Sequence, residues 1–297
     1  MFPRNTDALI DATSELIANS SDEQEVLEAF AVRAMIYRDR GQRSLAIEDF
    51  SECIRRLPGN VDYYKERALL FAEEKRPTEA LADFTHVIKT APDGWTYANR
   101  GAMFVRLRQL DLAIDDLQQA LTLGNITPEV CFNWGLAHFY KEEYLLAILG
   151  FNDALSLNPD YPQALMQRGL SHSRMCEYTR ALEDYELAVE SNPEYGNGNN
   201  NLAWLLATCP DQSIRNGPRA LTLAKKACDS VGWTNAHYLG TYAAACAEVE
   251  RFGDAIQWQE KAIRTPGYFS KPDDEVKAYF RLKLYQEKKP YRLDMNP

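Results

Sequence analysis

The chain has 297 residues, of which 45% are hydrophobic and 26% charged, values typical of a folded globular protein and not of a disordered one. Its 33 Lys and Arg face 43 Asp and Glu, a formal net charge of −10 that argues against nucleic acid as the main partner. No apolar run reaches the roughly 18 residues that span a bilayer, and the segment from Met1 to Asp7 lacks the apolar stretch of a secretory signal. We therefore expect a cytoplasmic chain without a nucleic-acid or membrane partner.

The first predicted element is a helix over residues 6–19. Leu9, Leu16 and Ile17 recur on one helical stripe there, so this helix can cover the apolar end of whatever follows it. Residues 1–26 are accordingly expected to form an N-terminal capping segment.

Small residues recur at a period of about 34 from residue 27 to residue 266. The first series consists of Ala34, Ala68, Gly101, Gly135, Gly169, Ala203 and Ala243. The second series consists of Ala46, Ala80, Ala113, Ala147, Ala181, Ala220 and Ala255. The two positions lie 12 residues apart in every copy except the sixth, where they lie 17 apart, so an insertion at residues 209–218 is expected in that copy.

Each copy is predicted to form two amphipathic helices. Apolar or small residues repeat at steps of three and four on both sides of the small positions, which is the spacing of one helical face. Small residues allow two helices to approach closely, and a large side chain four positions after the second small residue can fill the next interface, as Phe50, Phe84 and Phe151 would. Pro58, Pro92 and other recurring prolines stand where the second helix must end.

The chain resembles the tetratricopeptide repeat (TPR) family, and the resemblance extends over residues 27 to about 266. The fourth copy carries much of the motif, in Trp134, Gly135, Tyr144, Ala147, Phe151, Ala154 and Pro159. The resemblance implies an all-α, right-handed α-solenoid of about seven helix pairs, of the kind found in bacterial arrays. Residues 1–26 and 267–297 would then be the N-terminal and C-terminal capping segments.

The C-terminal segment is predicted to hold a helix over residues 273–289. Between residues 271 and 292 seven basic residues stand against four acids, a local charge of +3 that we interpret as a solvated outer face.

Residues suited to catalysis or metal binding are few. His138 and His172 recur 34 residues apart on an apolar stripe and are interpreted as packed core imidazoles. Paired acids such as Asp115 and Asp116 are interpreted as surface groups, and the six cysteines lack metal or disulfide spacing. The sequence therefore predicts no catalytic residue, no metal site and no cofactor, and a protein that is not an enzyme.

The first helix of each copy carries a second stripe, which lines the concave groove in the family that the chain resembles. Two positions before the small residue, this stripe has the amides Asn99, Asn133, Gln167 and Asn201. Amide side chains both donate and accept, so this ladder can pair with the main chain of an extended peptide. Apolar and aromatic side chains share the stripe and are predicted contact residues: Phe132, Leu136, Phe139, Tyr140, Met166, Leu170 and Trp204.

The resemblance implies a non-enzymatic scaffold that binds a protein or an extended peptide in this groove. It does not imply the carboxylate clamp with which some members hold a chaperone tail, because Glu129 and Asn133 replace its lysine and arginine. One alternative is that the ladder is only a family habit. A second is a structural module whose apolar stripe docks another copy, as a homodimer. A third is an enzyme with its site in the insertion 209–218, which lacks a nucleophile–base pair.

Overall fold

The structure is a computed structural model that describes residues 6–269 and 272–294. Sixteen α-helices and no strand occur in these residues. The chain divides into two compact units, residues 1–141 and residues 142–297.

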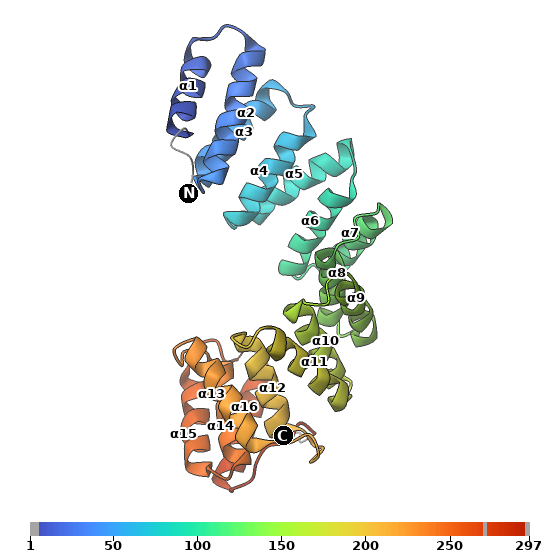
Figure 1. Ribbon diagram of the computed structural model, residues 1–297, viewed down its shortest axis with the longest axis vertical. Helices are drawn as coiled ribbons and strands as arrows, with labels where there is room; N and C mark the ends of the chain where they lie inside the picture. Colours follow the sequence, from blue (N-terminus) through green and yellow to red (C-terminus); the bar gives the residue numbers. More distant parts are fainter. Residues whose placement is uncertain (1–5, 270–271, 295–297) are drawn as a thin grey trace. The chain divides into compact units, whose positions relative to one another are not determined.

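The first unit contains eight helices (Figure 1). They are α1 (Thr6–Asn19), α2 (Glu23–Asp39), α3 (Arg43–Arg56), α4 (Val61–Glu73), α5 (Pro77–Thr90), α6 (Gly94–Arg106), α7 (Leu110–Thr122) and α8 (Pro128–Tyr140). α1 packs against α2 and covers the end of the first pair, as its apolar stripe predicts.

The second unit contains the other eight. They are α9 (Tyr144–Leu157), α10 (Pro162–Arg174), α11 (Tyr178–Ser191), α12 (Gly196–Thr208), α13 (Gly217–Ser230), α14 (Ala236–Glu248), α15 (Phe252–Arg264) and α16 (Pro272–Gln286). α16 packs against α15 at the end of the array.

The helices pack in consecutive pairs within each unit, in a solenoid-like arrangement. The recurring alanines of both series are fully buried between paired helices. Glycine brings two pairs closer still, because a Cβ at Gly101 would lie 2.8 Å from Leu117 Cγ and one at Gly169 would lie 2.7 Å from Tyr185 Cε1. The prediction of an all-α array of helix pairs with capping helices is confirmed.

The turn inside a pair places one residue in the left-handed region of backbone conformation. Gly41 does so in the first copy, whereas Lys75, Arg108 and Cys176 adopt positive φ angles of 59°, 60° and 61° in later copies. Only glycine reaches this region without a steric penalty, so the later turns store strain that the packed helices hold in place.

Four buried arginine–aspartate pairs connect the helices, and the sequence analysis did not find them. Each joins the residue before a small residue on the first helix to an aspartate 16 positions later on the second helix: Arg33–Asp49, Arg67–Asp83, Arg100–Asp116 and Arg168–Asp184. Each arginine also donates from Nη1 to a polar side chain of the preceding helix: Ser14, Ser51, Thr85 and Asn152 respectively. The interpretation of Asp116 as a surface group is therefore wrong, since its carboxylate is buried in one of these pairs.

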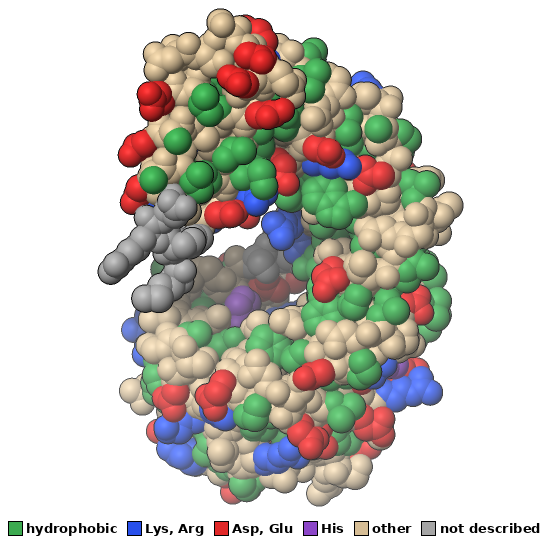
Figure 2. Space-filling model, turned by 45° about the horizontal axis from the view of Figure 1, so that its top comes forward, with side chains coloured by type: hydrophobic (Ala, Val, Ile, Leu, Met, Phe, Trp, Pro, Cys, Tyr) green, Lys and Arg blue, Asp and Glu red, His purple; other side chains and the backbone are tan. Residues whose placement is uncertain are grey.

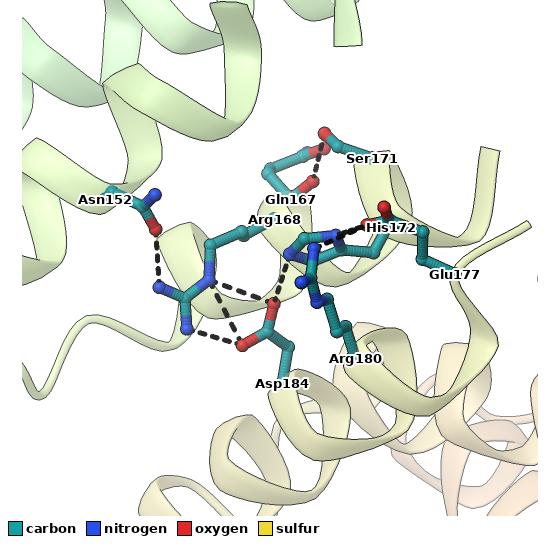
Figure 3. A network of polar contacts seen from close by, with 8 residues as sticks. All are labelled: Asn152, Gln167, Arg168, Ser171, His172, Glu177, Arg180 and Asp184. Carbon is teal, nitrogen blue, oxygen red and sulfur yellow. Dashed lines mark hydrogen bonds and ion pairs between the residues drawn. The ribbon is translucent and has the colours of Figure 1, made fainter. Parts of the chain in front are cut away.

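Figure 3 shows this arrangement around Arg168. Arg168 Nη2 lies 2.6 Å from Asp184 Oδ1, and Nη1 donates to Asn152 Oδ1 at 2.7 Å. His172 is buried as predicted, but it also faces two carboxylates, with Nδ1 2.6 Å from Glu177 Oε2 and Nε2 3.9 Å from Asp184 Oδ2. His138 packs edge-on against Trp134, with ring centroids 4.2 Å apart.

The chain after α16 turns back onto α12. Leu293 N donates to Thr208 O at 2.9 Å, and the ring of Tyr291 lies 5.8 Å from that of Trp204. Arg292 lies 2.7 Å from Glu248 on α14, and its side chain is only 17% exposed. Arg292 thus contradicts the interpretation of this basic segment as a solvated outer face.

The connection between α12 and α13 is held against the helices. Arg215 Nη1 donates to Cys209 O and Pro210 O, and its Nε lies 3.2 Å from Glu248 Oε1. Ile214 is buried. The connection is therefore tied down by a buried apolar residue and by a carboxylate that it shares with the C-terminal segment.

Candidate functional site

Six of the predicted groove residues lie in the first unit, on α6 and α8. All six are half-buried. Asn99 donates from Nδ2 to Trp95 O, one turn earlier on its own helix, at 2.9 Å. Leu136 and Tyr140 pack against the core of Ala98, Phe104 and Leu117, together with other apolar residues.

The end of α8 is an aromatic surface with a cation on it. Phe139 and Tyr140 have ring centroids 5.8 Å apart, and Arg108 Cζ lies 3.4 Å from the centroid of Tyr140. Phe132 and Asn133 lie on the same helix, half-buried. The aromatic stripe of the fourth copy is thus in part a packing surface between helices.

The other five predicted residues lie in the second unit, on α10 and α12. Met166 is buried at 5% exposure, so it belongs to the core, and Asn201 Nδ2 lies 3.9 Å from its sulfur. Gln167 Oε1 is buried without a hydrogen-bond partner within the described residues. Leu170 and Trp204 are half-buried.

Three of these residues, Leu170, Asn201 and Trp204, line one pocket of about 800 Å³. Residues of the first helices α10, α12 and α14 line it, together with residues of α11 and α16, Tyr268 and Tyr291. This volume falls within the range of about 300–1,000 Å³ that is usual for ligand sites. The C-terminal part of the predicted stripe therefore lies in a partly enclosed pocket.

Arg281 is the main pocket residue that the sequence analysis missed. Its Cζ lies 5.6 Å from the ring centroids of both Trp204 and Tyr291, and its Nη2 donates to Tyr268 Oη at 3.1 Å. Tyr268 comes this close to α14 because Gly240 has no side chain. The repeat pattern could not reveal Arg281, because α16 lies outside the repeats.

The buried thiols are unsuited to nucleophilic chemistry. Burial raises the pKa of Cys53 and Cys228 to about 12 and that of Cys246 to about 11, so all three stay protonated near neutral pH. Within the described residues, no cluster of three or more His, Cys, Asp or Glu side chains is arranged to hold a metal ion. None of the described helices combines the length and the apolar character needed to cross a membrane.

The face seen in Figure 2 shows acidic and basic side chains interspersed with hydrophobic ones. The basic side chains on that face do not form one continuous patch of the kind that steers nucleic acid.

Two family models match the chain, both described as tetratricopeptide repeat, over residues 32–94 and 162–195. Together with the buried small residues and the consecutive helix pairs, these matches decide the family. The chain contains tetratricopeptide repeats. No curated protein matches it by sequence.

Solved structures, two of them described as TPR proteins, share this fold. A TPR protein from Parabacteroides merdae matches with a TM-score of 0.65 at 16% identity, over 88% of this chain and 98% of that one. A chain of the APC/C hetero-tetramer Cut9–Hcn1 matches with a TM-score of 0.63 at 17% identity, over 81% of this chain, and this chain spans about half of it, 46%. YrrB, described as a TPR protein with an unusual peptide-binding site, matches with a TM-score of 0.53 at 17% identity, over 65% of this chain and 96% of YrrB.

TPR proteins generally mediate protein–protein interactions and are typically not catalytic. At identities of 16–17%, the likeness to these structures shows the shared fold alone.

Proposed function

We propose that this protein is a non-enzymatic scaffold and that the pocket of its second unit binds a short extended segment of a partner protein. One observation carries the proposal: Leu170, Asn201 and Trp204, predicted as contact residues from the repeat register, line the same pocket of about 800 Å³. A site of this size suits a few residues of chain rather than a flat protein surface.

The chain itself offers an example of the contact. The segment from Tyr291 to Leu293 lies against α12 and forms neither helix nor strand. Its contacts include a main-chain hydrogen bond from Leu293 N to Thr208 O and an aromatic contact between Tyr291 and Trp204. Main-chain bonding plus side-chain pockets is a recurring mode of peptide recognition.

In this proposal, the amide side chains of the pocket bind the main chain of the peptide. Asn201 lines the pocket beside Asn200, whose Nδ2 donates to Asn201 Oδ1 at 3.1 Å. The main-chain N–H and C=O groups of an incoming peptide would form hydrogen bonds with this pair, because amides offer both a donor and an acceptor. Leu170 and Trp204 would bury the apolar side chains.

The test uses the full chain and a library of random octapeptides, from which binders are selected. Leu170→Ala, Asn201→Ala and Trp204→Ala are each expected to weaken the selected peptides at least roughly tenfold, the range of one lost contact residue. Trp95→Ala is the matched control, because Trp95 is a tryptophan on a first helix of the other unit and is 40% exposed.

Thermal unfolding of each variant shows that it is folded. Binding that depends on none of the three pocket residues would overturn the proposal, and so would a library that yields no binder. The molar mass of the chain, measured over a range of concentrations, distinguishes this proposal from the alternative of a self-associating module. The mass of such a module would fall on dilution.

A further inference from the structure

Arg281 differs from the other enclosed arginines of this chain. Arg33, Arg67, Arg100 and Arg168 each pair with an aspartate, and Arg215 and Arg292 share Glu248. No carboxylate of the described residues lies within ion-pair distance of Arg281. Within the described residues, its one hydrogen bond goes to Tyr268 Oη, which is a neutral acceptor.

The guanidinium of Arg281 has donors to spare. Arginine carries five N–H groups in a planar fork that matches a carboxylate. Only Nη2 of Arg281 has a hydrogen-bond acceptor, and Nε is enclosed without one in the part of the chain that the structure describes. The rings of Trp204 and Tyr291 stabilise the cation through their faces, but they do not neutralise it.

A cation enclosed without a counter-ion is costly, because it loses hydration and gains no opposite charge. Elsewhere the chain avoids this cost, because each of those six enclosed arginines has an acid beside it. An arginine that lies in a pocket wall without a protein counter-ion is expected to meet its counter-ion in a ligand.

The other charges of the pocket decide which anion fits. Besides Arg281, the lining has the bases Arg174 and Lys277 and the acids Glu142, Asp273 and Asp274. Asp274 precedes Arg281 by seven residues of α16, about 10 Å along the helix axis. The positive and negative charges of the lining thus balance. A ligand group with a single negative charge is therefore tolerated at Arg281, whereas a doubly charged phosphate would be repelled by the three acids.

We propose that Arg281 binds a carboxylate of the partner segment, so that the pocket selects peptides carrying an aspartate or a glutamate. This inference rests on the proposed function and adds the chemistry that the site reads. The rings of Trp204 and Tyr291 and the Tyr268 hydroxyl hold the guanidinium in place for a two-pronged contact.

The experiment uses the octapeptides selected by the unaltered chain. Each is resynthesised with its acidic residues replaced singly, Glu by Gln or Asp by Asn, and amidated at its C-terminus so that only side-chain carboxylates are tested. For one acidic position of each peptide, the acid form is expected to bind at least roughly tenfold more tightly than the amide form, as for a charge-assisted contact. Arg281→Met should abolish this ratio, and Arg281→Lys should keep part of it because lysine retains the charge but not the fork.

Lys277→Met is the matched control, because Lys277 lies one turn earlier on α16 and lines the same pocket. It should leave the ratio unchanged. Thermal unfolding adds a readout that separates binding from structure: a residue that meets its counter-ion in a ligand can be replaced by methionine without lowering the melting temperature.

The outcomes are distinct for the two proposals. If selected peptides depend on Trp204 but show no preference for an acid, or if Arg281→Met keeps that preference, the carboxylate site is wrong and the peptide site stands. If no selected peptide depends on Leu170, Asn201 or Trp204, the peptide site itself is wrong.

Discussion

Arg100 and Asp116, sixteen residues apart, form a two-pronged ion pair between α6 and α7, with Nε 2.7 Å from Oδ2 and Nη2 2.8 Å from Oδ1. The same arginine reaches Thr85 on α5. One side chain therefore connects three helices of two adjacent copies. Three further copies repeat this geometry, whereas the fourth copy has Trp134 and Gly150 at the equivalent positions and lacks both charges.

Replacing one partner of this pair should be strongly destabilising. Arg100→Ala leaves Asp116, which is 5% exposed, without its counter-ion. We expect the free energy of unfolding to fall by about 3–5 kcal/mol, as for a broken buried pair. Urea denaturation measures this loss.

The double variant Arg100→Met/Asp116→Leu should lose less than the sum of its two single variants, because neither charge is then left alone. Arg264→Ala is the control, since its ion pair with Glu260 on α15 is solvent-exposed and such pairs contribute about 0–1 kcal/mol. Equal losses for Arg100→Ala and Arg264→Ala would show that the buried pair adds nothing to stability.

Gly169→Ala should destabilise the second unit. The added methyl group would lie 2.7 Å from the ring of Tyr185, which is itself buried, and overpacking of this kind costs about 1–3 kcal/mol. Gly253→Ala on α15 is the matched control, because its Cβ meets nothing within 4 Å and alanine favours a helix by about 1 kcal/mol. Melting temperatures should therefore move in opposite directions, and a rise in both would remove Gly169 from the helix interface.

Lys75→Gly should stabilise the first unit. Lys75 is exposed and holds a φ of 59°, a conformation that costs a residue with a side chain about 1–2 kcal/mol, partly offset by the chain entropy of glycine. Gly41→Ala is the reciprocal change, at a φ of 72° with open space around the new Cβ, and should be destabilising. Chemical denaturation of both variants tests whether the backbone of this turn, and not its side chain, sets the difference.

Thiol labelling at pH 8 should modify Cys176 and leave the buried cysteines unmodified until the chain unfolds. Cys176 is exposed, whereas burial raises the pKa of Cys53 and Cys228 to about 12, so they remain protonated. In the folded chain the pKa values of these thiols lie above the ordinary value of 9.0. Their contribution to the free energy of unfolding is therefore fully present below pH 9 and is lost as the pH rises towards 12. Rapid labelling of more than one thiol in the native chain would contradict the burial.

The repeat period alone was enough to predict the helix pairs, because a residue that must fit between two helices can only be small. Ala34, Ala46 and their equivalents are fully buried where the register places them. The capping helix at residues 6–19 was also predictable, since the end of an array exposes an apolar face. The arginine–aspartate pairs were within reach of the sequence too, because their spacing of 16 residues recurs with the period.

Only the tertiary structure decided what surrounds the predicted contact residues. A helical stripe says which side chains share a face, but not whether a later segment covers that face. Asn99 bonds its own helix, Met166 enters the core, and Trp204 meets Tyr291, which lies 87 positions later in the sequence. The local sequence determined the repeating helices of this protein, while its pocket arises from contacts between the repeats and a C-terminal segment that has no periodic pattern to reveal its path.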